Sequence, residues 1–251
     1  MGYCHYCKQD KTLIKAHIIP KHFYLDYKEE KFVLVDALSL KTKIKQSGTL
    51  DKNILCADCD GKILKKFDDE GYRILLNEIP KHTVMRTPTE AFYHLKQEEF
   101  NYELLRKFFI SILWRASISK LDENSEVSLG MYEEKALDIL KGKNSYDNLF
   151  KILIFKFPDN LDYNKVVFTS KAKFGNCITY VINMAGYHIL VIVNMKNFNP
   201  RLKEHYRNYL LQKENLFVIE SKMLYMHNVQ GITRKWNEML QKGFRPPNIK
   251  Y

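Results

Sequence analysis

Two Cys-x-x-Cys pairs constrain this chain more than any other feature of its sequence. The first pair is Cys4 and Cys7, the second is Cys56 and Cys59, and 48 residues separate the two pairs. A short loop within each pair lets two sulfur atoms reach one ion, and four thiolates form the tetrahedral shell of a structural Zn²⁺ site. We therefore expect these four cysteines to bind zinc. Because a closed four-cysteine site leaves no open coordination position, the zinc is expected to be scaffold and not catalyst.

The fifth cysteine and the start of the chain indicate where the protein works. Cys177 lies in an apolar run and is expected in the core. Four cysteines paired at two-residue spacing fit a metal in a reducing compartment better than they fit disulfides. The first residues form no basic leader, and no window approaches about 18 apolar residues in a row. We expect a soluble cytoplasmic protein with no membrane partner.

The order of residues around the cysteines resembles the HNH (ββα-metal) endonucleases. His17 follows the first pair and is itself followed by Ile-Ile-Pro, and Asp60 stands directly behind the last cysteine. The resemblance covers about residues 1–80. It implies that the four cysteines are structural zinc ligands and that His17 is the general base. It also places Asp60 where the family has a metal-binding His or Asn, and Asp51, five residues before Cys56, near the family's central Asn.

One position departs from the family pattern. The family usually has Asp, His or Glu just before the base, whereas this chain has Ala16. Asp60 and Asp51 are then the oxygen donors left for a catalytic Mg²⁺ or Mn²⁺, and both ions prefer such ligands. Phosphodiester hydrolysis needs a base to deprotonate water and a divalent cation to neutralise the phosphate.

Each of these residues also has a structural interpretation. His17 could be a buried or hydrogen-bonding histidine under the zinc lobe. His22, five residues later, is the other nearby imidazole and is a second candidate for binding metal or phosphate. Asp60 could cap the N-terminus of the helix that follows Cys59. Asp51 could be a turn residue before the strand-like 53–55 segment. The sequence leaves these alternatives open.

The positive charge of the chain is concentrated near its C-terminus. Residues 143–251 hold 17 Lys and Arg against 7 Asp and Glu, compared with 9 against 10 in 81–142 and 14 against 12 in 1–80. A basic region attracts polyanions, because neutralising phosphates releases their counterions. This distribution favours a nucleic-acid partner, and DNA as that partner is what the HNH resemblance implies. A basic surface that only keeps the protein soluble is the alternative.

Hydrophobic periodicity predicts the secondary structure. Helical spacing is found at 61–79, 100–120, 132–141, 201–212 and 232–241. Strands are expected at 32–35 and 42–45 as a hairpin, and at 151–157, 166–169, 178–182 and 187–193, with a hairpin turn at 183–186. Residues 81–97, with Pro88 and several threonines, are expected to be a connector.

The fold class that follows is α+β. An N-terminal zinc-stabilised, HNH-like lobe over residues 1–80 precedes a helical connector and a mixed-sheet, basic domain over 81–251. Three functions are considered. The first is a metal-dependent DNA endonuclease, such as a bacterial antiphage defence or toxin effector. The second is a catalytically silent zinc module that binds nucleic acid. The third is a purely structural zinc protein whose basic C-terminal region contacts another protein, and that partner could be a regulatory protein or a second copy of the chain.

Overall fold

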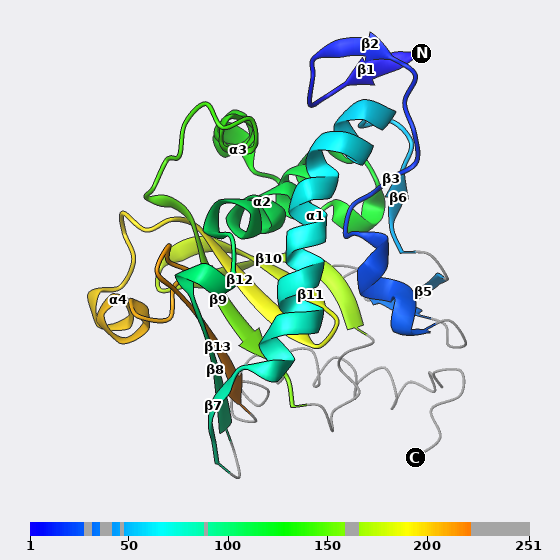
Figure 1. Cartoon of the computed structure of the whole chain (residues 1–251). Helices are drawn as coiled ribbons and strands as arrows, with labels where there is room; N and C mark the ends of the chain where they lie inside the picture. The colour runs from blue at the N-terminus through cyan, green and yellow to red at the C-terminus, as the bar shows by residue number, and fades with distance from the viewer. Residues whose placement is uncertain (28–31, 36–41, 46–47, 88–89, 159–165, 222–251) are drawn as a thin grey trace, which may run out of the picture.

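The computed structural model describes residues 1–27, 32–35, 42–45, 48–87, 90–158 and 166–221. The protein has a large mixed sheet, a group of helices on one face of the sheet, and an N-terminal part that packs on those helices (Figure 1). The expected α+β class with a mixed sheet is therefore confirmed. Of the helices described, none combines the length and the apolar character that crossing a bilayer requires.

The sheet has the strand order β5-β4-β10-β11-β12-β9-β13-β8-β7. Neighbouring strands are antiparallel except for β4 beside β10 and β9 beside β13, which are parallel. Its strands are β4 (Phe32–Val35), β5 (Thr42–Lys45), β7 (Thr83–Arg86), β8 (Glu90–Lys96), β9 (Leu149–Lys156), β10 (Val166–Phe174), β11 (Cys177–Met184), β12 (Tyr187–Asn194) and β13 (Asn215–Ser221).

The centre of the sheet forms where the sequence is most apolar. All of β12 except its last residue is buried, and β11 and β9 flank it. Ala185 and Gly186 connect β11 to β12 with φ values of 48° and 79°. Two successive left-handed residues make the tight turn that matches the twist of a hairpin, and glycine adopts this conformation without strain. The hairpin expected at 183–186 is confirmed.

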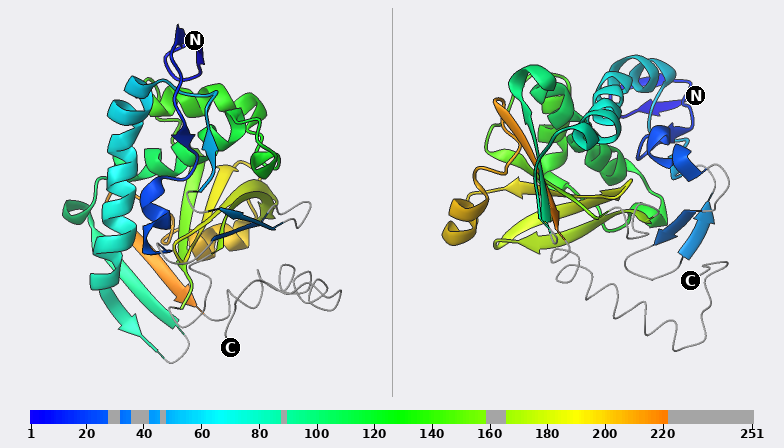
Figure 2. Two further views of the ribbon diagram at one scale, coloured as in Figure 1. Left: turned by 90° about the vertical axis from the view of Figure 1, so that its right-hand side faces the viewer. Right: turned by 60° about the horizontal axis from the view of Figure 1, so that its bottom comes forward.

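Three helices cover one face of the sheet, as Figure 2 shows. The central one, α2 (Tyr102–Ile118), begins at Asn101, whose side chain accepts a hydrogen bond from the Leu104 amide at 3.0 Å. Such a cap satisfies one of the unpaired amides of the first turn. Helix α3 (Glu133–Leu140) packs on α2, as does the helix of residues 59–78. That helix consists of a π-helical turn Cys59–Leu64, α1 (Lys65–Tyr72) and a second π-helical turn Arg73–Glu78.

The N-terminal part shares its hydrophobic core with these helices. It contains the strand pairs β1 (Gly2–Cys4) with β2 (Gln9–Lys11), and β3 (Ala16–His17) with β6 (Leu50–Asp51). The ring of Phe23 stacks on Phe108 of α2 at 5.4 Å. Gly71 lies so close to Phe108 that a Cβ there would be 2.4 Å from its ring. Gly71 therefore allows close helix packing and does not interrupt the helix.

The opposite face of the sheet is covered by a single segment that contains one short helix, α4 (Pro200–Tyr206), among the described residues. A second hydrophobic cluster there joins residues of β9, β11 and β12 to the segment that contains α4. Figure 2 shows α4 on the far side of the sheet from α1. Short 3₁₀ turns complete the described fold: Lys21–Tyr27, Ile79–Lys81, Gln97–Glu99, Asp122–Asn124 and Gly130–Tyr132.

Some sequence expectations are wrong in detail. The connector expected at 81–97 contains two strands, β7 and β8, because Ala91, Tyr93 and Leu95 alternate with less buried residues and face the core. Strand β13 was not anticipated. The helix expected at 201–212 is limited to α4. The hairpin at 32–35 and 42–45 is confirmed, and the helix expected at 232–241 lies outside the described residues.

Candidate metal centre and active site

The first Cys pair is held by the β1–β2 hairpin. Cys4 ends β1 and pairs with Gln9, and Cys7 lies in the turn between the strands. The turn closes through a hydrogen bond from the Lys8 amide to the Cys4 carbonyl at 2.8 Å, with Lys8 in the left-handed region at φ 61°. This geometry points both thiols of the pair toward the same side.

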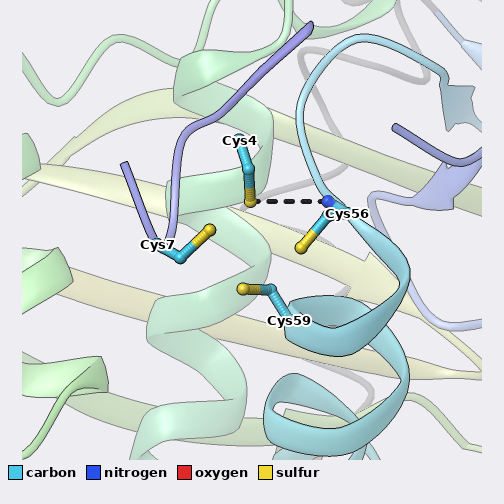
Figure 3. Close-up of side chains that lie close together, drawn as sticks. All are labelled: Cys4, Cys7, Cys56 and Cys59. Atoms are coloured by element: carbon cyan, nitrogen blue, oxygen red, sulfur yellow. Dashed lines mark hydrogen bonds between the residues drawn. The ribbon is translucent and has the colours of Figure 1, made fainter. Parts of the chain in front are cut away.

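The second pair is brought to the first by backbone pairing. The His5 amide donates to the Ile54 carbonyl at 3.0 Å, and the Ile14 amide donates to the Leu55 carbonyl at 2.9 Å. Cys59 then lies in the first turn of the helix of residues 59–78. The Cys56 amide donates to Sγ of Cys4 at 3.4 Å (Figure 3).

The four sulfur atoms converge. Figure 3 shows Cys4, Cys7, Cys56 and Cys59 facing one another, and their Sγ atoms all lie within 4.8 Å of one another. Cys7 is partly exposed and the other three are buried. Four cysteines arranged in this way could hold a metal ion such as zinc, as the spacing of the pairs predicts.

The electrostatics of the metal-free thiols agree with this interpretation. Burial alone would raise the pKa of Cys4, but hydrogen bonds from the amides of Cys7, Cys56 and Tyr6 favour the thiolate and lower the pKa to about 7. Burial and the neighbouring thiols raise the pKa of Cys59. Without a cation the cluster therefore favours one thiolate, whereas a divalent cation would favour ionisation of all four.

The metal centre packs on the helices of the C-terminal part. The ring of Tyr6 meets that of Trp114 in α2 edge to face, with centroids 6.0 Å apart. The Tyr6 hydroxyl donates to the carbonyl of Leu140 at the end of α3, at 3.4 Å, and Nζ of Lys141 lies 5.5 Å from the ring centroid. A metal bound by the four cysteines would therefore stabilise this contact as well.

His17 lies on the short antiparallel pair β3–β6. Ala16 pairs with Asp51 and His17 pairs with Leu50. Ala16 is buried and His17 is partly exposed, as expected for neighbours that point to opposite sides of a strand. The carbonyl of His17 accepts a hydrogen bond from Nη1 of Arg115 at 3.1 Å. The backbone of the proposed base is thus anchored to α2.

The same guanidinium binds the helix of residues 59–78. Arg115 donates from Nη2 to Oδ1 of Asp68 at 2.8 Å and from Nη1 to Oδ2 at 3.2 Å. The Arg115 side chain is 1% exposed and that of Asp68 is 14% exposed. Two parallel bonds in a buried place are a strong, oriented contact. Arg115 therefore fixes the position of β3 relative to α1.

Asp60 lies within electrostatic reach of this ion pair. Burial raises the pKa of its carboxyl, the charge of Arg115 lowers it, and the charge of Asp68 raises it. Its amide donates to the Cys56 carbonyl at 3.1 Å, so Asp60 already belongs to the helix. The residue at the N-cap is Asp58, whose side chain makes no capping bond. Among the described residues, no side-chain hydrogen bond of Asp60 is found, so the capping alternative has no support here.

Asp51 has two hydrogen-bond partners. Its Oδ2 accepts from the Ser119 hydroxyl at 2.7 Å, and its Oδ1 accepts from the Asn53 amide at 2.8 Å. The second bond is the turn role that the sequence allows, and the first ties β6 to the end of α2. Asp51 is 3% exposed. Its catalytic role stays a prediction.

The structure brings some predicted residues together and not others. Within the described part of the chain, the four cysteines are the only group of three or more His, Cys, Asp or Glu close enough to share a metal. His17, Asp51 and Asp60 do not form a second such group. His22 packs on Tyr72 of α1, with ring centroids 4.9 Å apart. Tyr72 is about three turns beyond Asp60 in the same helix, so His22 is distant from Asp60.

Two residues of this region were missed by sequence reasoning. Asp68 and Arg115 are 47 positions apart, and neither belongs to a motif. The available signal was an arginine inside the apolar pattern of α2, where an unpaired charge would be costly. No protein-family model, curated protein or solved structure matches this chain.

Proposed function

We propose that this protein is a metal-dependent DNA endonuclease of the HNH type. The observation that carries the proposal is the order of elements around His17: a short antiparallel pair, β3 with β6, followed directly by a helix whose first turns hold Cys59 and Asp60. A strand pair and a following helix are the elements that the resemblance implies. Arg115 connects the two through His17 and Asp68.

The residues have distinct parts in the proposed reaction. His17, partly exposed on β3, accepts the proton of the attacking water. Asp60 supplies a carboxylate, and Mg²⁺ in nucleases and polymerases is usually held by one or two carboxylates plus substrate phosphate and water. A bound divalent cation would neutralise the charge that develops on the phosphate. The charge of Arg115 is already balanced by Asp68, so the part of Arg115 is to hold β3 and the helix of residues 59–78 in place.

In this proposal the four cysteines hold a structural zinc ion. The ion would tie the β1–β2 hairpin to the start of the helix that carries Asp60, and so fix the distance between that helix and β3. The resemblance also suggests a biological role, a bacterial defence or toxin effector that acts on DNA in the cytoplasm.

Supercoiled plasmid tests this function. The purified protein should nick or linearise plasmid with Mg²⁺ or Mn²⁺, and EDTA should stop the reaction. Asp60→Ala should abolish cleavage, whereas Asp60→Asn should retain part of it, because an amide oxygen can still bind the cation. Equal cleavage by Asp60→Ala and the wild type, at equal melting temperature, would reject the metal role of Asp60.

A second function, nucleic-acid binding without catalysis, is favoured by two observations. Ala16 offers no ligand where the HNH pattern has one, and both carboxylate oxygens of Asp51 already have partners. A catalytically silent module would bind labelled DNA in a gel-shift assay with an affinity that falls as salt is added. It would leave plasmid intact with every divalent cation tried. Cleavage that depends on Mg²⁺ or Mn²⁺ would eliminate this alternative.

A further inference from the structure

The sheet face opposite the helices carries an unusual combination of rings and positive charges. Rings from two neighbouring strands and from the segment after α4 meet there, and all are partly exposed. We define the aromatic platform as Phe92, His94, Tyr209 and Phe217. The segment of residues 195–210 lies on the same face, because its apolar residues pack in the second hydrophobic cluster, and Lys213 follows shortly after it.

The aromatic platform is built by strand register. Phe217 of β13 lies directly opposite His94 of β8, and their rings stack at 4.3 Å between centroids and 8° between planes. The ring of Tyr209 meets Phe217 edge to face at 6.1 Å and lies 6.5 Å from that of Phe92. His94 is also oriented by a 2.8 Å hydrogen bond between Nε2 and the Asn215 side chain. The rings are therefore held in fixed orientations.

Positive charges lie on the same segment that supplies Tyr209 to the platform. Residues 195–214 contain five Lys and Arg against two Asp and Glu. All five basic side chains are exposed: Lys196, Arg201, Lys203, Arg207 and Lys213. Arg207 pairs with Glu204 at 3.7 Å, and the other four have no ion pair with any described residue. We call these five residues the basic layer. Part of the basic excess of the C-terminal region is thus concentrated on one face.

We propose that the aromatic platform and the basic layer together bind single-stranded nucleic acid without sequence preference. Unstacked bases have open π faces that stack on exposed rings, while their phosphates attract lysine and arginine. In a duplex the base faces are covered by neighbouring bases, so the platform favours single strands. This inference rests on the proposed function, since it names a second surface for the nucleic acid that the nuclease would cut, on the sheet face opposite the helices.

Measuring binding in EDTA tests this surface without cleavage, because EDTA removes the divalent cation that the proposed reaction needs. The probe is a fluorescent oligothymidylate of about 20 nucleotides, followed by anisotropy over a range of salt concentrations. The triple variant Arg201→Gln/Lys203→Gln/Lys213→Gln should bind at least tenfold more weakly at low salt. Its slope of log affinity against log salt should fall by about 2, since each phosphate contact to a single strand contributes about 0.7.

A matched triple variant controls for net charge. Lys143→Gln/Lys171→Gln/Lys173→Gln removes the same charge from elsewhere on the surface, and Lys171 and Lys173 lie on the helix side of the sheet, opposite Tyr180 and Ile178. These three side chains are exposed. The control should keep the wild-type salt slope. An equal decrease of the salt slope in both triple variants would overturn the inference, because positive charges would then contribute to binding equally wherever they lie on the surface.

The rings are tested separately. Phe217→Leu and Tyr209→Leu should each weaken binding by about tenfold and leave the salt slope unchanged, because stacking involves no counterions. If Phe217→Leu lowers the melting temperature, His94→Gln serves instead, since Gln can keep the bond to Asn215 while removing the ring. Unchanged affinity in folded ring variants, or tighter binding of duplex than of single strand, would overturn the inference.

The two proposals can fail independently. Plasmid cleavage with Mg²⁺, together with identical binding by the two triple variants, would keep the nuclease and reject this surface. Binding that depends on the basic layer, without any cleavage, would keep the surface and reject the nuclease.

Discussion

Arg115 of α2 and Asp68 of α1 form a buried, two-bond ion pair whose N–O distances are 2.8 and 3.2 Å. The same guanidinium holds the carbonyl of His17 on β3. One side chain thus joins three elements of the candidate active site, and the first prediction concerns its removal.

Arg115→Met should lower the free energy of unfolding by roughly 3–5 kcal/mol, because it leaves the Asp68 carboxylate without its buried partner. Urea unfolding followed by circular dichroism measures this loss. Lys65→Met is the matched control, since Lys65 pairs with Asp69 on the exposed side of α1 and should cost less than about 1 kcal/mol. Similar losses of unfolding free energy in the two variants would show that the buried pair stabilises the protein no more than the exposed pair does.

Gly71 should tolerate no side chain while Phe108 is in place. Gly71→Ala puts a Cβ 2.4 Å from the Phe108 ring and should destabilise the protein by about 1–3 kcal/mol. Gly61→Ala, in the same helix with no neighbour within 4 Å, should be neutral or stabilising by up to about 1 kcal/mol. The double variant Gly71→Ala/Phe108→Leu should recover part of the loss in a thermal melt, and no recovery would contradict the packing explanation.

The metal centre should require all four of its cysteines. Cys56→Ser should reduce the zinc content of protein purified without chelators from about one ion per chain to near zero, and should lower the melting temperature. Cys177→Ala is the control, because Cys177 lies in β11, outside the cluster. Elemental analysis makes the measurement. Absence of zinc from the wild type, or equal zinc in the Cys56 variant, would contradict the four-cysteine site.

His188 should make stability depend on pH. Burial lowers the pKa of its imidazole from 6.5 to about 4 in the folded protein. Below about pH 6.5 the unfolded chain binds a proton that the folded chain does not, so stability falls as the pH drops toward 4 and is constant with respect to this group above 6.5. The total loss from this group is roughly 3 kcal/mol.

His188→Gln should remove that dependence while keeping a polar partner for Asn183, whose Oδ1 lies 2.7 Å from Nδ1 of His188. Unfolding by urea at pH 7 and at pH 4.5 gives the comparison. His205→Gln, on the exposed surface of α4, should follow the wild type. If the free energy of unfolding changes equally between pH 7 and pH 4.5 in the wild type and in His188→Gln, this imidazole is not the group that titrates.

The sequence predicts local features of this fold better than distant ones. The four-cysteine cluster and the hairpin at Ala185 and Gly186 follow from ligand spacing and turn chemistry, which are local. The alternation in β8 was present in the sequence but was obscured by Pro88 and the threonines beside it. Asp68 and Arg115 could not be paired from the sequence, because their contact depends on how α1 and α2 pack. Asp51 and Ser119 are a second pair of this kind.

The central claim is that His17 acts as a general base, and one comparison tests it most directly. Plasmid cleavage with Mg²⁺ or Mn²⁺ is measured for the wild type, His17→Ala and the control His82→Ala, whose imidazole lies beside Glu99 at the far end of the helix. His17→Ala should reduce the cleavage rate about a hundredfold or more, with zinc content and melting temperature unchanged, and His82→Ala should cleave like the wild type. Cleavage at the wild-type rate by His17→Ala would contradict the proposed active site.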